Sequence, residues 1–363
     1  MERASSIKRG EVRHGPRRYE SNELKDFASC VLVAVDLPPG DASTVADLMV
    51  RADLRGSDGH GIFRLPHYVK RIRGGGVKVN PKIRIVQETA ATALVDGDNG
   101  MGHLVMSVAA KVAIEKSSKT GIGWVGVKNS NHAGPAALYA MMPLEQNMIG
   151  IYFAVGNANH VAPFGGVEPL LSTNPIAVAI PALAEAPVVL DMATTIAAFG
   201  KIKTARQRGE RIPEGWMIDG EGRPITDPER AEHGTLLPIA GYKGYGLALV
   251  FGFLAGTLNG AAHGRDVIDF NADIGSVTNT GHAIMALDIK AFGSVDVFKG
   301  RVDTLIRDIR KSTKAPGVQR IWLPGEQSHA IWQERSAHGI PLHPGLVESL
   351  RALADELAVP NLR

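Results

Sequence analysis

The chain has 363 residues, of which 44% are hydrophobic, and its 40 basic side chains nearly balance its 37 acidic ones. This composition predicts a globular protein with more than one core, and the balanced charge argues against a dedicated nucleic-acid binder. The small basic excess is local, since six basic side chains lie within the first eighteen residues: Arg3, Lys8, Arg9, Arg13, Arg17 and Arg18. We interpret this segment as a solvated terminus, which lacks the apolar stretch of a signal peptide.

The single cysteine, Cys30, excludes an intramolecular disulfide. It fits a reducing compartment, and we therefore expect the protein in the cytoplasm. Because Cys30 lies in the apolar run CVLVAV, we expect its thiol to be buried and unreactive.

The first eighty-five residues are predicted to be mainly helical. Apolar residues recur at helical spacing in residues 22–36, 42–54 and 65–72, and proline or glycine clusters follow the first and third segments. Residues 82–86 and 93–96 then have the composition of a pair of strands.

From residue 104 onward, helical and extended segments alternate, which predicts an α/β lobe. The expected elements, in chain order, are a helix at 104–113, strands at 123–127, 149–155, 177–180 and 188–191, a strand at 284–289, and helices at 302–312 and 344–357. The charged residues 203–235, rich in glycine and proline, predict a long loop or lid. The uncharged run 244–264 is long enough to span a bilayer, but its six glycines and its polar residues favour a core helix.

A dinucleotide fingerprint, G-x-G-x-x-G, occurs at Gly121, Gly123 and Gly126. A phosphate cradle needs these glycines on a turn from a strand to a helix, whereas here a helix-like segment precedes them and a strand follows. We therefore interpret this as a chance match. The sequence also lacks a P-loop and the HExxH and paired CxxC patterns of metal sites, and we expect no metal.

The segment DLRGSDGHGIFR, residues 53–64, places His60 between Gly59 and Gly61, with Arg64 four residues later. The two glycines suggest a backbone that approaches a ligand and an imidazole free of packing neighbours. If the segment begins a helical turn, His60 and Arg64 share one face. Histidine can act as a base near neutral pH, and a guanidinium can bind a carboxylate with two hydrogen bonds.

Further polar turns follow predicted strands. His132 lies in KNSNHAGPAALYA, where Gly134 would let a ligand approach the backbone, although a capping turn fits equally well. Thr173 in STNP has hydrogen-bonding neighbours, and Asp191 ends the strand VVLD, where it could bind a ribose diol or cap a helix. Glycine turns with a charge occur in GYKGYG and WLPGEQ, which contain Lys243 and Glu326. Read singly, each of these turns could be purely structural.

Taken in order, seven motifs resemble the malate/L-lactate dehydrogenase family of type-2 NAD(P)-dependent oxidoreductases, which includes ureidoglycolate and L-sulfolactate dehydrogenases. The motifs are DLRGSDGHGIFRLPHY, NSNHAGPAALYA, PFGGVEPLLSTNP, VVLDMATT, IPEGWMIDGEGRPITDP, GYKGYGLAL and LPGE. The resemblance runs from about residue 20 to the C-terminus.

This resemblance implies a distinct, non-Rossmann α/β fold with a mixed sheet, helices and two to three lobes, usually as a homodimer. It implies an N-terminal helical part of the substrate lobe at 1–85, a cofactor-binding lobe at 86–300, and a C-terminal helical segment at 301–363 that packs back on the N-terminal part. The implied activity is hydride transfer between NAD or NADP and a small 2-hydroxy or 2-oxo acid, with malate or lactate as the first expectation. We expect neither nucleic acid nor a membrane as a partner.

The resemblance also implies the residues of the site. The family's catalytic histidine corresponds to His132, and its first-motif histidine corresponds to His60. Arg64 and Thr173 correspond to substrate-binding residues. The implied cofactor contacts are His132, Ala133, Gly134, Pro135, Ala136, Asp191, Met192, Ala193, Lys243, Pro324, Gly325 and Glu326.

Two positions depart from the pattern of imine-reducing members. Many relatives have serine just before the first histidine, where this chain has Gly59, with Ser57 two residues earlier. Some imine reductases carry aspartate where this chain has Lys201. Both departures favour a hydroxy-acid dehydrogenase over an NADPH-dependent reductase of cyclic imino acids or diketo acids. A third alternative is a nucleotide-binding relative that has lost activity, against which the presence of His60, His132 and Arg64 speaks.

Overall fold

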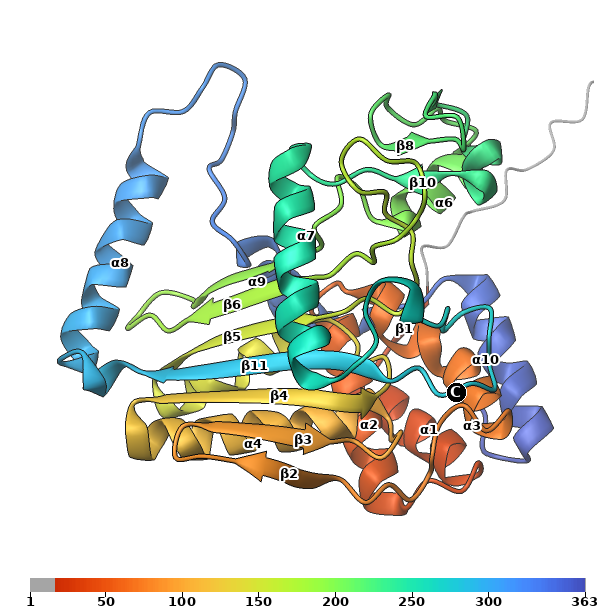
Figure 1. Ribbon diagram of the computed structural model, residues 1–363, viewed down its shortest axis with the longest axis horizontal. Coiled ribbons are helices and arrows are strands. Elements are labelled where there is room, and N and C mark those ends of the chain that lie inside the picture. The colour runs from red at the N-terminus through yellow and green to blue at the C-terminus, as the bar shows by residue number, and fades with distance from the viewer. Residues whose placement is uncertain (1–16, 363) are drawn as a thin grey trace, which may run out of the picture.

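A computed structural model describes residues 17–362, and its centre is a mixed seven-stranded sheet (Figure 1). The strand order is β2-β3-β4-β11-β5-β6-β7. The strands are β2 (Arg84–Glu88), β3 (Thr92–Asp96), β4 (Ile122–Ser130), β5 (Met148–Ala154), β6 (Ile176–Ile180), β7 (Val188–Met192) and β11 (Thr280–Asp288). Only β3 and β4 pair in parallel, so the predicted mixed α/β architecture is confirmed.

The directions of these strands collect the predicted motifs at one edge of the sheet. β11 is antiparallel to both β4 and β5, and β6 is antiparallel to both β5 and β7. The carboxyl ends of β3, β4, β5 and β7 therefore lie at the same edge as the amino ends of β6 and β11. His132 follows β4, Thr173 precedes β6 and Asp191 lies near the end of β7, so all three belong to this edge.

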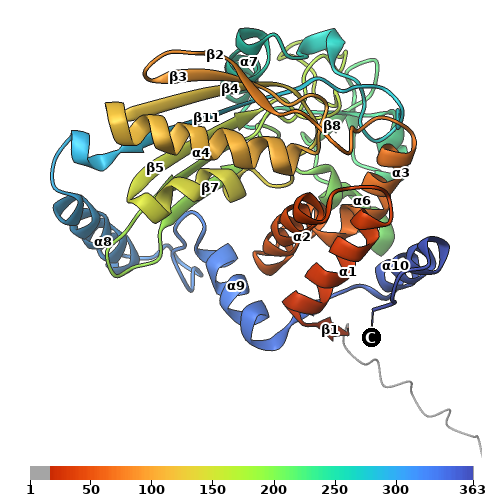
Figure 2. The ribbon, with the colours of Figure 1, turned by 90° about the horizontal axis from the view of Figure 1, so that it is seen from below.

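Two helices cover the two faces of the sheet. α4 (Gly102–Thr120) lies along one face and α7 (Tyr242–Ala255) crosses the other (Figures 1 and 2). The glycines of the false fingerprint allow this close packing: a Cβ at Gly123 would lie 2.1 Å from the carbonyl oxygen of Ala113 in α4. Gly121 ends α4 in a left-handed conformation with φ +84°. These glycines lie at the end of α4 and within β4, so their role is structural.

A second core joins the two ends of the chain. It is built by α1 (Ser21–Val33), α2 (Pro39–Leu54), α3 (Leu65–Arg73) and α10 (Pro344–Leu357), and Leu24, Met49, Leu65 and Leu350 lie buried in it. β1 (Arg18–Tyr19) pairs with β12 (Ile340–Pro341) beside it. The C-terminal helices thus lie against the N-terminal ones (Figure 2).

Two expectations for the N-terminal region have definite outcomes. The thiol of Cys30 is exposed, so the prediction of a buried cysteine was wrong. Its helix α1 buries Leu24, Phe27, Ala28 and Val31, and residue 30 falls on the opposite face of that stripe. Of the six basic residues near the N-terminus, only Arg17 and Arg18 lie within the described range.

The segment 203–235 has more structure than the loop or lid that we expected. It contains the end of α6 (Phe199–Arg208) and a three-stranded sheet of β8 (Met217–Ile218), β9 (Pro224–Ile225) and β10 (Thr235–Leu236). Ile212, Met217, Ile225 and Leu236 are buried in a small core to which Val161, Leu171 and Ala248 also contribute. Strands of two residues are too short to show alternation, and the sequence pattern therefore missed them.

Two further helices differ from the prediction or were absent from it. α8 (Val295–Lys311) begins earlier than expected, and α9 (Glu326–His338) was not predicted. α9 is exposed on most of its length, so it lacks the apolar periodicity by which a helix is recognised. The short helix α5 (Ala137–Ala140) follows the His132 turn.

The apolar run 244–264 is only partly a core helix. α7 ends at Ala255, and Leu247, Val250 and Phe253 are each exposed by more than 40%. Within the described residues, no helix has the length and apolar character needed to cross a bilayer.

Candidate active site

The first-motif histidine lies on a broken turn between α2 and α3. Asp58–His60 and Ile62–Arg64 form two separate 3₁₀ turns, with Gly61 between them. His60 and Arg64 therefore do not share the face of one helix, and that expectation was wrong. Instead the Nε–H of Arg64 donates back to the carbonyl oxygen of Gly59 at 2.9 Å.

The two glycines beside His60 have different roles. A Cβ at Gly61 would lie 2.0 Å from Oδ1 of Asp53, whereas a Cβ at Gly59 would meet nothing within 4 Å. Asp53 is only 2% exposed, and its Oδ2 accepts the backbone N–H of Ile62 at 2.7 Å. Burial raises the pKa of this carboxyl to about 8. Gly61 is thus required because the chain passes directly over a buried carboxyl group.

The turn that carries His132 is fixed from several directions. The Nδ2 of Asn131 donates to the carbonyl oxygens of Asn99 and Gly100, at 3.2 and 3.1 Å. Buried His282 of β11 lies with its Nε2 3.3 Å from the carbonyl oxygen of Asn131. Gly134, two residues after His132, has φ +76°, a conformation that favours glycine. The position of His132 is therefore set by a network that spans β4, β11 and the start of α4.

The turn brings His132 against His60, although 72 residues separate them. The Nε2 of His132 lies 3.3 Å from Nδ1 of His60, and the two rings are stacked with centroids 5.3 Å apart. The hydroxyl of Tyr68, on α3, lies 2.6 Å from Nδ1 of His132. His60 is therefore packed against another ring rather than free of neighbours, which corrects our expectation. Tyr68, His132 and His60 form one hydrogen-bonded chain.

Burial keeps this chain uncharged. It lowers the pKa of His60 to about 4 and that of His132 well below the usual 6.5, and the positive charge of Arg64 lowers both further. Burial also raises the pKa of the Tyr68 hydroxyl, which therefore keeps its proton. At neutral pH both imidazoles are therefore uncharged. A general base must be uncharged in this way before it can accept a proton.

The loop between α7 and β11 closes one side of the site. The ring of Phe270 stacks on His132 with centroids 5.4 Å apart, and Phe270 is only 1% exposed. Arg71 of α3, fully buried, holds this loop through the carbonyl oxygens of Ser276 and Asp273. The sequence reasoning missed both Tyr68 and Phe270. The spacing could have identified Tyr68, because it follows Arg64 by four residues, which is about one helical turn.

Two of the segments with predicted cofactor contacts meet at this edge, and a third lies beside the start of β7. Oδ2 of Asp191 accepts the backbone N–H of Ala137 at 2.9 Å, which joins β7 to the turn at 133–136. The N–H of Val189 in β7 donates to the carbonyl oxygen of Pro324 at 3.1 Å. Asp191 thus caps α5, a helix far from it in sequence, and not the helix that follows it.

Lys243 and Glu326, the remaining charged cofactor candidates, differ in whether the charged group already has a partner. Lys243 is exposed in the first turn of α7, and the described residues offer its ammonium group no ion pair. The carboxylate of Glu326 is fully engaged: Oε1 accepts from Arg310 and Arg320, at 2.9 and 2.8 Å, and Oε2 accepts the N–H of Leu323 at 3.0 Å. Glu326 therefore fits a role in shaping the loop at Pro324 and Gly325.

Thr173 lies at the same edge but makes no direct contact with the histidine pair. Its carbonyl oxygen accepts the N–H and the hydroxyl of Thr194, both at 2.9 Å, so it ties the loop before β6 to the loop after β7. Its own hydroxyl has no hydrogen-bond partner among the described residues.

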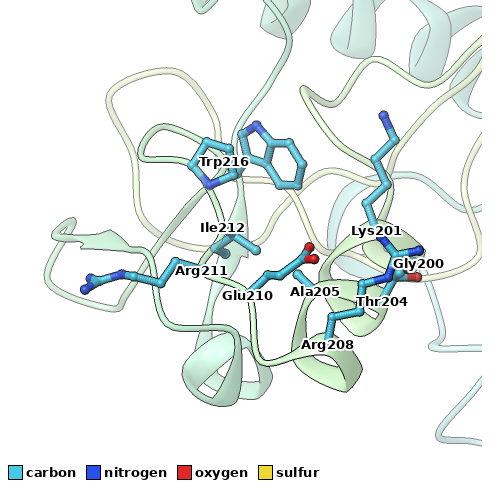
Figure 3. Close-up of a pocket in the computed structure, with 10 residues that line it drawn as sticks. Gly200, Lys201, Thr204, Ala205, Arg208, Glu210, Arg211, Ile212 and Trp216 are labelled. Atoms are coloured by element: carbon cyan, nitrogen blue, oxygen red, sulfur yellow. The ribbon is translucent and has the colours of Figure 1, made fainter.

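A separate cavity of about 430 Å³ lies in the region of α6 (Figure 3). Its lining includes Lys201, Arg208, Glu210 and Trp216. None of the histidines or predicted cofactor residues lines it, so it is not part of the site described above.

Comparison with known proteins identifies the family of this chain. A family model described as malate/L-lactate dehydrogenase matches residues 19–351. The chain belongs to the malate/L-lactate dehydrogenase family. It is 40% identical to a malate dehydrogenase of Pyrococcus abyssi over 98% of this chain and 99% of the relative. It is 39% identical to an L-sulfolactate dehydrogenase of Methanothermobacter thermautotrophicus over 91% of this chain and 94% of the relative.

A solved malate dehydrogenase from Pyrococcus horikoshii superposes on this member of the family with a TM-score of 0.89 at 36% identity. The match covers 98% of this chain and 100% of that one. A more distant relative from Chromohalobacter salexigens is named (2R)-3-sulfolactate dehydrogenase (NADP(+)); it is 32% identical over 93% of this chain and 98% of the relative. The predicted membership of the malate/L-lactate dehydrogenase family, and with it the non-Rossmann fold, is confirmed.

Proposed function

We propose that this enzyme oxidises a small 2-hydroxy acid to the 2-oxo acid, with malate as its first substrate, lactate as the second, and NAD or NADP as the cofactor. The observation that carries the proposal is the neutral His60–His132 pair, which lies near the guanidinium of Arg64 at the edge where Asp191 meets the turn after His132. A base, a carboxylate ligand and a nucleotide site are the three parts that this reaction requires.

His132 is proposed as the group that takes the hydroxyl proton. This role requires the tautomer with the proton on Nδ1, 2.6 Å from the oxygen of Tyr68, and it requires the substrate hydroxyl to replace Nδ1 of His60 as the partner of Nε2. After Nε2 accepts the proton, the oxygen of Tyr68 accepts the Nδ1–H of the imidazolium as a neutral partner, without the negative charge that the aspartate of a serine-protease triad supplies. His60, 3.3 Å from that nitrogen, lies beside the proton path and can share the charge.

Arg64 is proposed to bind the carboxylate next to the carbinol carbon. Its guanidinium charge is one of the causes that lower the pKa of His60 and His132, after burial. A bound carboxylate would offset that charge and remove this smaller cause of the shift, so the pKa of both imidazoles would rise, while burial would still keep it below 6.5. Substrate binding would thus strengthen the base at the moment when it is needed.

The residues present fit a nicotinamide dinucleotide. Lys243 has a free ammonium for the pyrophosphate, the backbone at Gly134 and Gly325 is left-handed, and Asp191 has one carboxylate oxygen beyond the bond to Ala137. We propose Ala133, Pro135, Ala136, Met192, Ala193 and Pro324 as further contacts, and Thr173 as a contact to the substrate. A nicotinamide held by these residues would supply the acceptor for the hydride of the carbinol carbon.

Imine reduction is less well supported. The ring of His60 bonds to His132, and among the described residues neither a serine hydroxyl nor a carboxylate bonds to it. The serine position is Gly59, and the side chain of Lys201 lies on the outside of α6.

The test is a substrate panel that follows the nicotinamide absorbance near 340 nm. We expect reduction of NAD or NADP with malate and slower reduction with lactate. In the reverse direction, we expect no oxidation of NADH or NADPH with cyclic imino acids. Tight NAD binding without turnover of any hydroxy acid, imine or diketo acid would indicate a relative that has lost activity. Turnover of the imines alone would replace the proposal by its alternative.

A homodimer is proposed from the outer face of α7. This face carries three exposed apolar side chains at a spacing of three residues: Leu247, Val250 and Phe253. An exposed apolar patch of this kind is typical of a protein–protein interface. We expect the protein, 38.6 kDa per chain, to sediment as a dimer and the Val250→Asp variant to sediment as a monomer. A monomeric wild-type protein at micromolar concentration would exclude this interface.

The lobes and the cellular location of the protein are also proposed. The helical core shared by α1–α3 and α10 would form the substrate lobe (residues 1–85 with 301–363), and the sheet the cofactor lobe (residues 86–300). We propose a cytoplasmic location on the basis of the single cysteine. Protease protection of the protein in spheroplasts would test it.

A further inference from the structure

The guanidinium of Arg64 is held at two points before any substrate arrives. Its Nε–H donates to the carbonyl oxygen of Gly59 at 2.9 Å, and its NH1 donates to Oδ1 of Asn271 at 3.0 Å. The NH2 group has no partner among the described residues. Arg64 therefore keeps one edge of the guanidinium open, and a carboxylate can bind there.

Asn271 itself is fixed, although its side chain is exposed. It follows Phe270, whose N–H donates to the carbonyl oxygen of Asn157 at 2.8 Å and whose carbonyl oxygen lies 2.9 Å from Nε2 of His67. The N–H of Asn271 donates to Oδ1 of Asp269 at 2.8 Å. The same rigid loop thus places Phe270 on His132 and Asn271 on Arg64.

We propose that Asn271 is a positioning residue that sets the affinity for anionic substrates through Arg64. This rests on the proposed role of Arg64 as the carboxylate ligand. An amide oxygen can orient the guanidinium without neutralising it, because the amide carries no charge. A carboxylate at the same place would pair with Arg64 and compete with the carboxylate of the substrate.

Asn271→Asp tests this inference, since it changes the charge and hardly the size of the side chain. With malate and saturating NAD, we expect the KM for malate to rise roughly 10- to 100-fold, the range for a charge-assisted hydrogen bond, while kcat changes by less than about threefold. Asn271→Ala, which only frees the guanidinium, should raise KM by less than Asn271→Asp. The dissociation constant for NAD, measured by tryptophan fluorescence, should stay unchanged.

Two controls separate positioning from a general effect. Gln87→Glu adds the same charge on exposed β2, away from the site, and should leave KM unchanged. In an Arg64→Ala background, whose KM is already raised, Asn271→Asp should change KM by less than about twofold, because its effect acts through Arg64.

The outcomes distinguish this inference from the proposed function. If Arg64→Ala raises KM but Asn271→Asp does not, Asn271 has no positioning role and the function of Arg64 stands. A full effect of Asn271→Asp in the Arg64→Ala background, or a loss confined to kcat, also overturns the inference. If Arg64→Ala leaves KM unchanged, both the carboxylate role of Arg64 and the inference fail.

Discussion

Replacing His132 by asparagine should lower kcat for hydroxy-acid oxidation by roughly 10²- to 10⁴-fold, the usual contribution of a general base. Asparagine keeps a side chain that can hydrogen bond to Tyr68, but it offers no basic nitrogen at the position of Nε2. Steady-state kinetics with malate, together with the NAD dissociation constant, would separate loss of chemistry from loss of binding.

The same experiment ranks the two histidines. Because His60 is proposed to share the charge and not to take the proton first, His60→Asn should cost less than His132→Asn. A larger loss for His60→Asn would reverse the two roles. His338→Asn, at the exposed end of α9, serves as the control and should retain wild-type activity.

The pH dependence follows from the direction of the pKa shifts. Only the neutral pair can accept a proton, and burial lowers the pKa of His60 to about 4 and that of His132 well below 6.5. In the free enzyme, kcat/KM for oxidation should therefore stay level as the pH falls from 7 through 6.5, and should decrease only at lower pH, where the pair becomes protonated. A titration centred near 6.5 would mean that the pair is solvated.

Replacing Gly61 by alanine should destabilise the protein by about 1 to 3 kcal/mol or more, the usual cost of overpacking. The added Cβ would lie 2.0 Å from the carboxyl oxygen of Asp53, and neither group can withdraw. Asp53 is buried and bonded to the N–H of Ile62, so the chain at 60–62 must shift and carry His60 with it. We therefore expect a lower urea midpoint together with a reduced kcat.

Gly59→Ala is the matched control for this variant. Both substitutions add one methyl group beside His60, but the Cβ at Gly59 has open space, and φ at Gly59 is not in the left-handed range. Gly59→Ala should retain the wild-type urea midpoint. Equal midpoints for the two variants would show that Asp53 does not restrict the path of the chain.

Local sequence patterns were sufficient for the long elements of this protein. α1, α2, α3 and α10 have clear apolar stripes, and the strands of the main sheet are short apolar runs between turn residues, so periodicity located them. The turn that contains His132 was noted because it followed a predicted strand, and its functional role was assigned by the resemblance to the family. Such signals depend only on neighbours in the chain.

The errors arose where burial or partners come from distant segments. Exposed Cys30 lies among apolar residues, and Leu247 and Phe253 lie on the outside of an apolar helix. None of these environments is determined by adjacent residues. The two-residue strands near α6 were missed because they are too short to show a period.

The sequence by itself determined the residue types of the chemistry: two histidines, an arginine, and glycine turns after strands. Only the tertiary structure decided how they act, because strand direction brings β4, β7 and the loop before β11 to one edge. There His132 meets His60 and Tyr68, and Arg64 meets Asn271, across 64 to 207 residues of chain. Hydrogen bonds and buried contacts over such separations leave no periodic trace in a single sequence, since they depend on how the sheet is assembled.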